Sequence, residues 1–141
     1  MDSDKSSRIT VQIKLLAPVE KVWHYWTEPD HITKWNFASD DWQTTFSEND
    51  LRSGGKFLSR MEAKDGSSGF DFFGTYDEVK LYERISYTLG DNRKVQIDFI
   101  PNNGETILIE TFDAETTYTP EKQQEGWQAI LNNFKKHVEQ G

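Results

Sequence analysis

Three histidines, His24, His31 and His137, supply the only imidazole groups of the chain. Imidazole is a common metal ligand and the side chain best suited to proton transfer near neutral pH. His24 and His31 belong to different short segments, His137 lies near the end of the chain, and none has a partner at a spacing typical of metal ligands. We therefore predict no metal site and assign the histidines to solvent-facing or helix-capping positions.

Carboxylates are the second group of side chains that could carry acid–base chemistry. Acidic pairs occur at positions 40–41 and 77–78, but adjacent residues of a strand point to opposite faces, so neither pair brings two carboxylates together. A single carboxylate inside an apolar cavity would have a raised pKa and could act as a general base. Asp71 and Glu110 are the candidates, and the sequence pattern allows each of them to face either the cavity or the solvent. Burial statistics favour a solvent-facing position for both.

Other catalytic signatures are missing from the sequence. Cysteine is absent, which excludes thiol catalysis and disulfides. No nucleophile elbow, phosphate-binding glycine loop or dinucleotide fingerprint occurs. The pair Gly54-Gly55 precedes a predicted strand rather than a helix, so it is interpreted as a turn. We therefore assign no catalytic residue and no cofactor.

Large aromatic side chains are the remaining candidates for a functional site. Aromatic residues make up 13% of the chain, and five of them are Trp and nine are Phe. Each one alone is best explained as core, but a group of rigid rings can leave an apolar space with a few polar groups, here the Tyr76 and Tyr87 hydroxyls. The predicted ligand-contacting residues are Trp35, Phe37, Trp42, Phe57, Phe72, Tyr76, Tyr87, Trp127, Ile130, Leu131 and Phe134.

A long C-terminal helix must form one wall of any such space. Thr119 and Pro120 are typical of a helix start, and an apolar stripe follows at helical spacing. The stripe consists of Trp127, Ile130, Leu131, Phe134 and Val138. Gly126 interrupts the helix-forming residues beside Trp127, which predicts a bend or a close backbone approach that could control entry.

The preceding residues predict one antiparallel sheet. Residues 8–16 alternate between apolar and polar, Pro18 and Pro29 bound a short helix, and a second short helix follows over residues 31–35. From residue 42 to 112 a period of two, broken by turn sequences, predicts six more strands, with Trp42, Thr44 and Phe46 on one face. Short turns require antiparallel pairing, and a sheet of seven twisted strands curves. The predicted fold class is α+β, with this sheet wrapped on the C-terminal helix.

Length, charge and the absence of long apolar segments limit the number of domains and the classes of partner. The chain of 141 residues is predicted to form a single domain over residues 8–141, after a disordered or frayed segment at 1–7. The net charge of −8 and the absence of a basic cluster argue against nucleic-acid binding. No apolar run is long enough to span a bilayer, and the N-terminus resembles no secretory signal, so we expect a cytoplasmic protein without membrane insertion.

Several short motifs carry a family likeness through nearly the whole chain. They are APVEKVW (17–23), PDHITKW (29–35), GGKF (54–57), GTYDEV (74–79), ERISYT (83–88) and GW (126–127). In this order they resemble the activator of heat shock protein 90 ATPase homologue-like family, of the START-like (SRPBCC) superfamily. The resemblance implies the helix-grip fold and a cavity between helix and sheet, which superfamily members commonly use for lipids, sterols, polyketides or other apolar molecules.

Three hypotheses on function follow. The first is a non-enzymatic carrier or sensor for a small apolar or amphipathic molecule that is lipid-, sterol- or polyketide-like. The second is a module that binds a chaperone in a stress response, as the family's namesake does. The third is an enzyme of the cyclase or dehydratase kind, for which Asp71, Tyr76 and Glu110 would supply the polar group. The sequence favours binding without catalysis, and we expect a monomer or a weak dimer.

Overall fold

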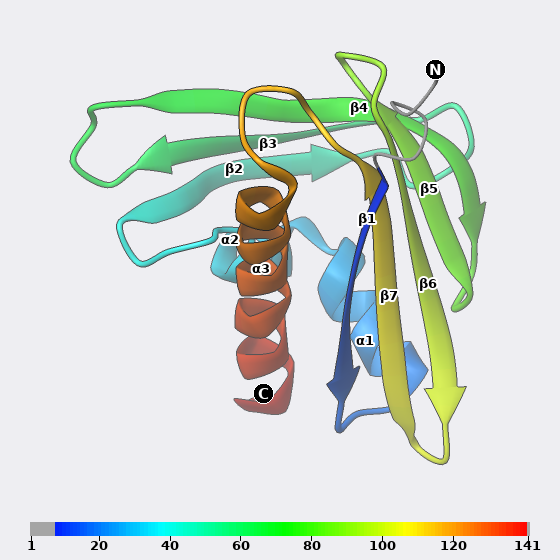
Figure 1. Cartoon of the computed structure of the whole chain (residues 1–141). Helices are drawn as coiled ribbons and strands as arrows, with labels where there is room; N and C mark the ends of the chain where they lie inside the picture. The colour runs from blue at the N-terminus through cyan, green and yellow to red at the C-terminus, as the bar shows by residue number, and fades with distance from the viewer. Residues whose placement is uncertain (1–7, 141) are drawn as a thin grey trace.

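The computed structural model describes residues 8–140 (Figure 1). The predicted order of one strand, two short helices, six strands and one long helix is confirmed. The elements are β1 (Arg8–Leu15), α1 (Val19–Thr27), α2 (Pro29–Trp35), β2 (Trp42–Asn49), β3 (Lys56–Ala63), β4 (Gly69–Lys80), β5 (Arg84–Leu89), β6 (Lys94–Asn102), β7 (Glu105–Asp113) and α3 (Pro120–Gln140). The predicted frayed segment 1–7 lies outside the described residues.

All seven strands form one antiparallel sheet in the order β1-β7-β6-β5-β4-β3-β2. Strands β2 to β7 form the predicted meander, and β1 joins the sheet beside β7. The sheet curls around α3, which crosses its concave side, while α1 and α2 close one end (Figure 1). This is the helix-grip arrangement, and it leaves the space between α3 and the sheet to be filled by side chains or by a ligand.

Both ends of α3 are held by specific contacts. The Lys122 backbone N–H donates to Thr119 Oγ1 at 3.2 Å, so the predicted N-cap is confirmed. Near the other end, Glu139 Oε2 accepts from the Leu16 backbone N–H at 2.9 Å, and Lys135 Nζ donates to the Lys14 carbonyl oxygen at 2.7 Å. These contacts attach the helix to β1 and to the residue that follows it.

Strand β7 supplies the inward-facing row opposite α3. Its side chains alternate regularly, and Thr106, Leu108, Glu110 and Phe112 are all buried. Three of these are ordinary core residues, because two are apolar and Thr106 donates to the Ala17 carbonyl oxygen at 2.8 Å. Glu110 is the exception, and it is the feature that distinguishes this sheet chemically.

One predicted facing pattern is wrong. Thr44 of β2 is buried and contacts Met61 Sδ at 3.3 Å, but Phe46 is 48% exposed. The register between β2 and β3 shifts between Thr44 and Phe46, which indicates a β-bulge. The extra residue reverses the alternation, so Phe46 lies on the outer face.

No helix among residues 8–140 is both long enough and apolar enough to cross a membrane.

Candidate functional site

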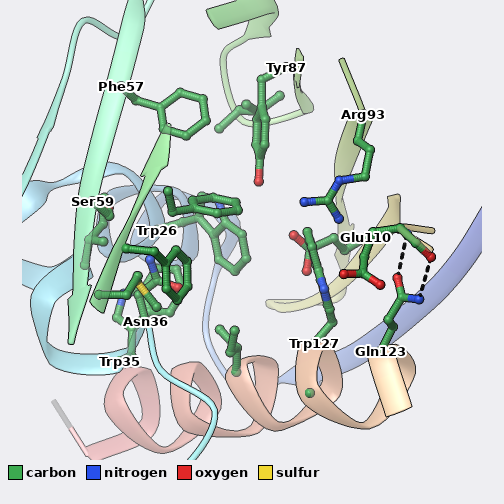
Figure 2. Close-up of a pocket in the computed structure, with 18 of the residues that line it drawn as sticks. Trp26, Trp35, Asn36, Phe57, Ser59, Tyr87, Arg93, Glu110, Gln123 and Trp127 are labelled. Atoms are coloured by element: carbon green, nitrogen blue, oxygen red, sulfur yellow. Dashed lines mark hydrogen bonds between the residues drawn. The ribbon is translucent and has the colours of Figure 1, made fainter. Parts of the chain in front are cut away.

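A cavity of about 480 Å³ lies between α3, α2 and the inner face of the sheet (Figure 2). This volume falls within the range of small-molecule sites, roughly 300–1,000 Å³. Helices α1 and α2 contribute Trp26, Ile32 and Trp35, strands β3 to β5 contribute Phe57, Phe72, Tyr76, Ile85 and Tyr87, and α3 contributes Gly126, Trp127 and Ile130. Nine of the 22 lining residues are aromatic, so rings form a large part of the walls, as the composition suggested.

The rings of the walls pack against one another rather than filling the space. Phe57 and Tyr87 meet edge to face with centroids 4.7 Å apart, and Phe72 and Tyr87 do so at 6.4 Å. Trp127 stacks on Phe112 with centroids 3.8 Å apart and ring planes 10° apart. The stack fixes Trp127 as a flat wall on the α3 side, because Phe112 is fully buried in the sheet.

The structure brings together most, but not all, of the predicted ligand-contacting residues. Trp35, Phe57, Phe72, Tyr76, Tyr87, Trp127 and Ile130 line the cavity, whereas Phe37, Trp42, Leu131 and Phe134 do not. Leu131 and Phe134 are fully buried on the same helix stripe but belong to the packed core. Trp42 lies against Phe70 with ring centroids 5.9 Å apart, so it contacts a lining residue rather than the cavity.

Several lining residues escaped the sequence prediction. Trp26 and Ile32 lie on the short helices, and the helical spacing of Val22, Trp23 and Trp26 is the signal that could have identified Trp26. Arg93, Glu115 and Tyr118 lie in turns or loops, where no periodic pattern indicates which way a side chain points.

Glu110 faces the cavity, which corrects the expectation that it faces solvent. Its residue is only 4% exposed, and burial raises the pKa of its carboxyl to about 8. Within residues 8–140 the carboxyl has no hydrogen-bond or ion-pair partner. Asp71 behaves as expected: it lies on the outer face of β4, exposed, with Oδ1 3.3 Å from Arg60 Nη1.

Two further polar groups lie near Glu110. Figure 2 shows the Tyr87 hydroxyl and the Arg93 guanidinium pointing toward the same part of the cavity. Burial, followed by the neighbouring Glu110 charge, raises the pKa of the Tyr87 hydroxyl well above its usual value. Arg93 is anchored by an Nε–H that donates to Asp91 Oδ2 at 2.8 Å. Burial also raises the pKa of Tyr76 to about 12, so both tyrosines are neutral near neutral pH.

Gln123 holds the loop between β7 and α3 that borders this polar end. Its Oε1 accepts from the Glu115 backbone N–H at 2.9 Å, and its Nε2 donates to the carbonyl oxygens of Glu115 at 3.0 Å and Tyr118 at 2.8 Å. The Gln123 side chain is buried, so these bonds are shielded from water. The loop is thereby fixed against the first turns of α3.

Gly126 lines the cavity, but not for the predicted reason. Helix α3 continues through it without interruption, and a Cβ at this position would have no neighbour within 4 Å beyond the local helix backbone. The predicted close backbone approach is therefore wrong. Because glycine has no side chain, the cavity instead extends to the helix backbone at this point.

The histidines form a cluster that sequence spacing did not reveal. His31 Nδ1 lies 2.8 Å from His137 Nε2, and the His24 and His31 ring centroids are 5.4 Å apart. The cluster forms because α3 returns its last turn to the short helices. Within residues 8–140, no three His, Cys, Asp or Glu side chains are arranged to hold a metal ion.

The comparisons with known proteins agree with this architecture. The family model described as "Activator of Hsp90 ATPase homolog 1-like protein" matches residues 16–139. The chain belongs to this family. A comparison with curated proteins finds no match.

Solved structures of similar proteins support the family assignment. An AHSA1-like protein from Aeromonas hydrophila is 48% identical with a TM-score of 0.85, covering 94% of this chain and 93% of that one. A Cytophaga hutchinsonii protein is 51% identical with a TM-score of 0.83, covering 95% and 93%. A Nitrosomonas europaea protein at 22% identity shares the fold, with a TM-score of 0.81 and coverage of 99% and 97%.

For this member of the Activator of Hsp90 ATPase homolog 1-like family, the site combines two chemical capacities. Its aromatic walls can bury an apolar body, and its polar end can exchange hydrogen bonds or a proton with a group on that body.

Proposed function

We propose that this protein binds a small apolar or amphipathic molecule in the cavity between α3 and the sheet, as a carrier or a sensor. The observation that carries the proposal is the cavity of about 480 Å³, lined by many aromatic rings, with Tyr87, Arg93 and Glu110 together at one end. Protein interiors normally pack with few voids larger than a water molecule. The apolar surface that lines a cavity of this size is available to contact a bound molecule, and a ligand that binds only the folded chain raises its stability.

A proton-transfer enzyme is the second candidate, because Glu110 is buried against the cavity. A carboxyl with a pKa of about 8 is suited to exchange a proton with a bound molecule near neutral pH. Such an enzyme would be of the cyclase or dehydratase kind, and Tyr76 and Tyr87 would stabilise the charge that develops. Turnover of a bound ligand that stops in Glu110→Gln, with binding retained, would favour this candidate over a carrier.

A chaperone-binding module is the third candidate, and its support is the family description alone. Stimulation of a purified chaperone's ATPase by this protein would favour it. Unaltered ATPase activity, together with no complex on a sizing column, would remove it.

The binding proposal is tested with the neutral fluorescent probe N-phenyl-1-naphthylamine. We expect saturable, one-to-one binding to the wild-type chain. A Cβ at position 126 meets no atom within 4 Å beyond the local helix backbone, so Gly126→Leu should extend its side chain into the cavity and weaken binding at least tenfold while the fold is kept. Gln124→Leu is the control, because it adds the same leucine side chain to α3 at an exposed position that does not line the cavity.

Equal probe binding by Gly126→Leu and the wild type would overturn the proposal. The probe would then be bound by surface side chains such as Phe46 and Phe73, which are 48% and 51% exposed.

A further inference from the structure

The polar end of the cavity carries side chains whose hydrogen-bonding groups have no partner in the protein. Among residues 8–140, neither the Glu110 carboxyl nor the Tyr87 hydroxyl takes part in a side-chain hydrogen bond. Glu110 is 4% exposed and Tyr87 is 8% exposed. A buried polar group without a partner is costly, because it has lost its hydrogen bonds to water and gained none in the protein. Both groups line the cavity, so a bound molecule can supply the partner.

From this geometry we infer that the cavity takes an apolar ligand carrying an anionic oxygen group, such as a carboxylate, which accepts hydrogen bonds from Glu110, Tyr87 and Arg93. The inference rests on the proposed binding function and specifies its ligand class. The apolar body would lie among the rings of Phe57, Phe72 and Trp127.

Each of the three groups acts as a donor at neutral pH. Burial raises the pKa of the Glu110 carboxyl to about 8, so at pH 7 it mostly carries a proton. The pKa of the Tyr87 hydroxyl is raised well above its usual value, so it also keeps its proton. Arg93 uses its Nε–H for Asp91, and its guanidinium points toward Tyr87 in Figure 2. An acceptor satisfies all three, and an anionic acceptor binds most strongly.

The other charged groups at this end favour the same ligand class. Besides Arg93, the lining includes Lys122 from α3 and Glu115 from the loop after β7. Glu115 Oε1 already accepts from the Tyr118 backbone N–H at 2.7 Å. Asp91 offsets part of the Arg93 charge from its other side, since their side chains are 2.8 Å apart. With Glu110 protonated, an ammonium group would meet the two cations of the lining with only Glu115 as an opposing charge, whereas an anionic group would meet two cations and one anion.

Alternative ligand groups leave the site incompletely satisfied. A hydroxyl can accept from two donors at most and must find an acceptor for its own proton. A wholly apolar ligand would leave all three donors unpaired and covered, which lowers affinity. The carboxylate is the simplest group with enough acceptor capacity for Glu110, Tyr87 and Arg93 together.

The test uses three ligands with one apolar body: biphenyl-4-carboxylate, biphenyl-4-methanol and biphenyl-4-methylamine. Each displaces N-phenyl-1-naphthylamine from the full chain in a competition titration at pH 7 and pH 9. At pH 7 we expect the carboxylate to bind at least tenfold more tightly than the other two. Arg93→Gln should weaken carboxylate binding about tenfold and alcohol binding much less.

Glu110→Gln separates a donor role from simple packing. In the wild type, carboxylate affinity should fall severalfold or more between pH 7 and pH 9, because an ionised Glu110 repels the ligand. In Glu110→Gln the affinity at pH 7 should fall only a few-fold, and the decline toward pH 9 should disappear, since the amide cannot ionise.

The failures are distinguishable. If the probe binds but the alcohol or the amine equals or exceeds the carboxylate, or no biphenyl displaces it, the ligand class is overturned and the binding function stands. If neither the probe nor any biphenyl binds, both are overturned.

Discussion

The Nδ1 atom of His31 lies 2.8 Å from the Nε2 atom of His137, which joins α2 to the last turn of α3. The Tyr25 ring stacks on His31 with centroids 3.9 Å apart, and His24 lies at the edge of the same group. One imidazole must donate and the other accept, so the bond cannot persist when both rings are doubly protonated. The contact is therefore sensitive to acid.

We predict that this pair lowers stability in mild acid. Burial first, and then the charges of His24 and Lys34, lower the pKa of His31; burial first, and then His31, Lys34 and Lys21, lower that of His137. A histidine whose pKa is lower in the folded than in the unfolded chain contributes to stability above about pH 6.5. That contribution is lost as the pH falls through the folded-state pKa. Urea unfolding at pH 7.5 and 5.5 should show a smaller loss in His31→Gln than in the wild type. Equal losses in both chains would contradict the prediction.

Glu110 should have the opposite pH dependence. Its folded-state pKa of about 8 lies above the ordinary glutamate value of 4.5, so its contribution to stability is fully present below about pH 4.5 and is lost as pH rises through 8. Each pKa unit corresponds to roughly 1.4 kcal/mol. Glu110→Gln should therefore be more stable than the wild type at pH 9, by an amount on the order of several kcal/mol.

The measurement for Glu110 is the difference in unfolding free energy between variant and wild type from pH 5 to 9. Taking this difference removes the histidine contribution, which runs the other way below pH 6.5. A difference that does not change with pH would show that Glu110 is not buried as an acid.

Gln123→Ala should destabilise the loop before α3. The substitution leaves the Glu115 N–H and the Glu115 and Tyr118 carbonyl oxygens without their partner. We expect a loss of roughly 1–3 kcal/mol in unfolding free energy and faster hydrogen exchange at the Glu115 amide. Gln124→Ala, at an exposed position, is the control and should change neither. Unaltered exchange in Gln123→Ala would mean that the loop is held by other contacts.

Gly126→Ala should stabilise the protein and leave the cavity open. Alanine in a helix interior is favoured over glycine by up to about 1 kcal/mol, and the added Cβ meets no atom within 4 Å beyond its own helix backbone. We expect a higher midpoint in urea and probe affinity within a few-fold of wild type. A large loss of affinity would instead restore the idea that a bend at Gly126 controls entry.

Local patterns were sufficient for the elements and their order. The alternation of residues 8–16, the prolines at 18 and 29, and the Thr119 cap each depend on neighbours a few residues away. Because short turns connect the strands, neighbouring strands must pair antiparallel. The apolar stripe of α3 must be buried, and a curved sheet provides the surface that covers it. The β2 bulge was missed because no residue type in that segment demands it.

The sequence alone was sufficient to predict the helix-grip fold class and to identify aromatic residues as candidates to line a cavity. The tertiary structure decided which way Glu110 points and which histidines meet. The run of apolar residues before Glu110 fits either face of a strand, and only pairing with β1 and β6 sets its orientation. His31 and His137 are far apart in the chain, and they meet because α3 packs along the sheet and returns its last turn to α2. Long-range packing, which local spacing does not encode, therefore decided the chemistry of the site.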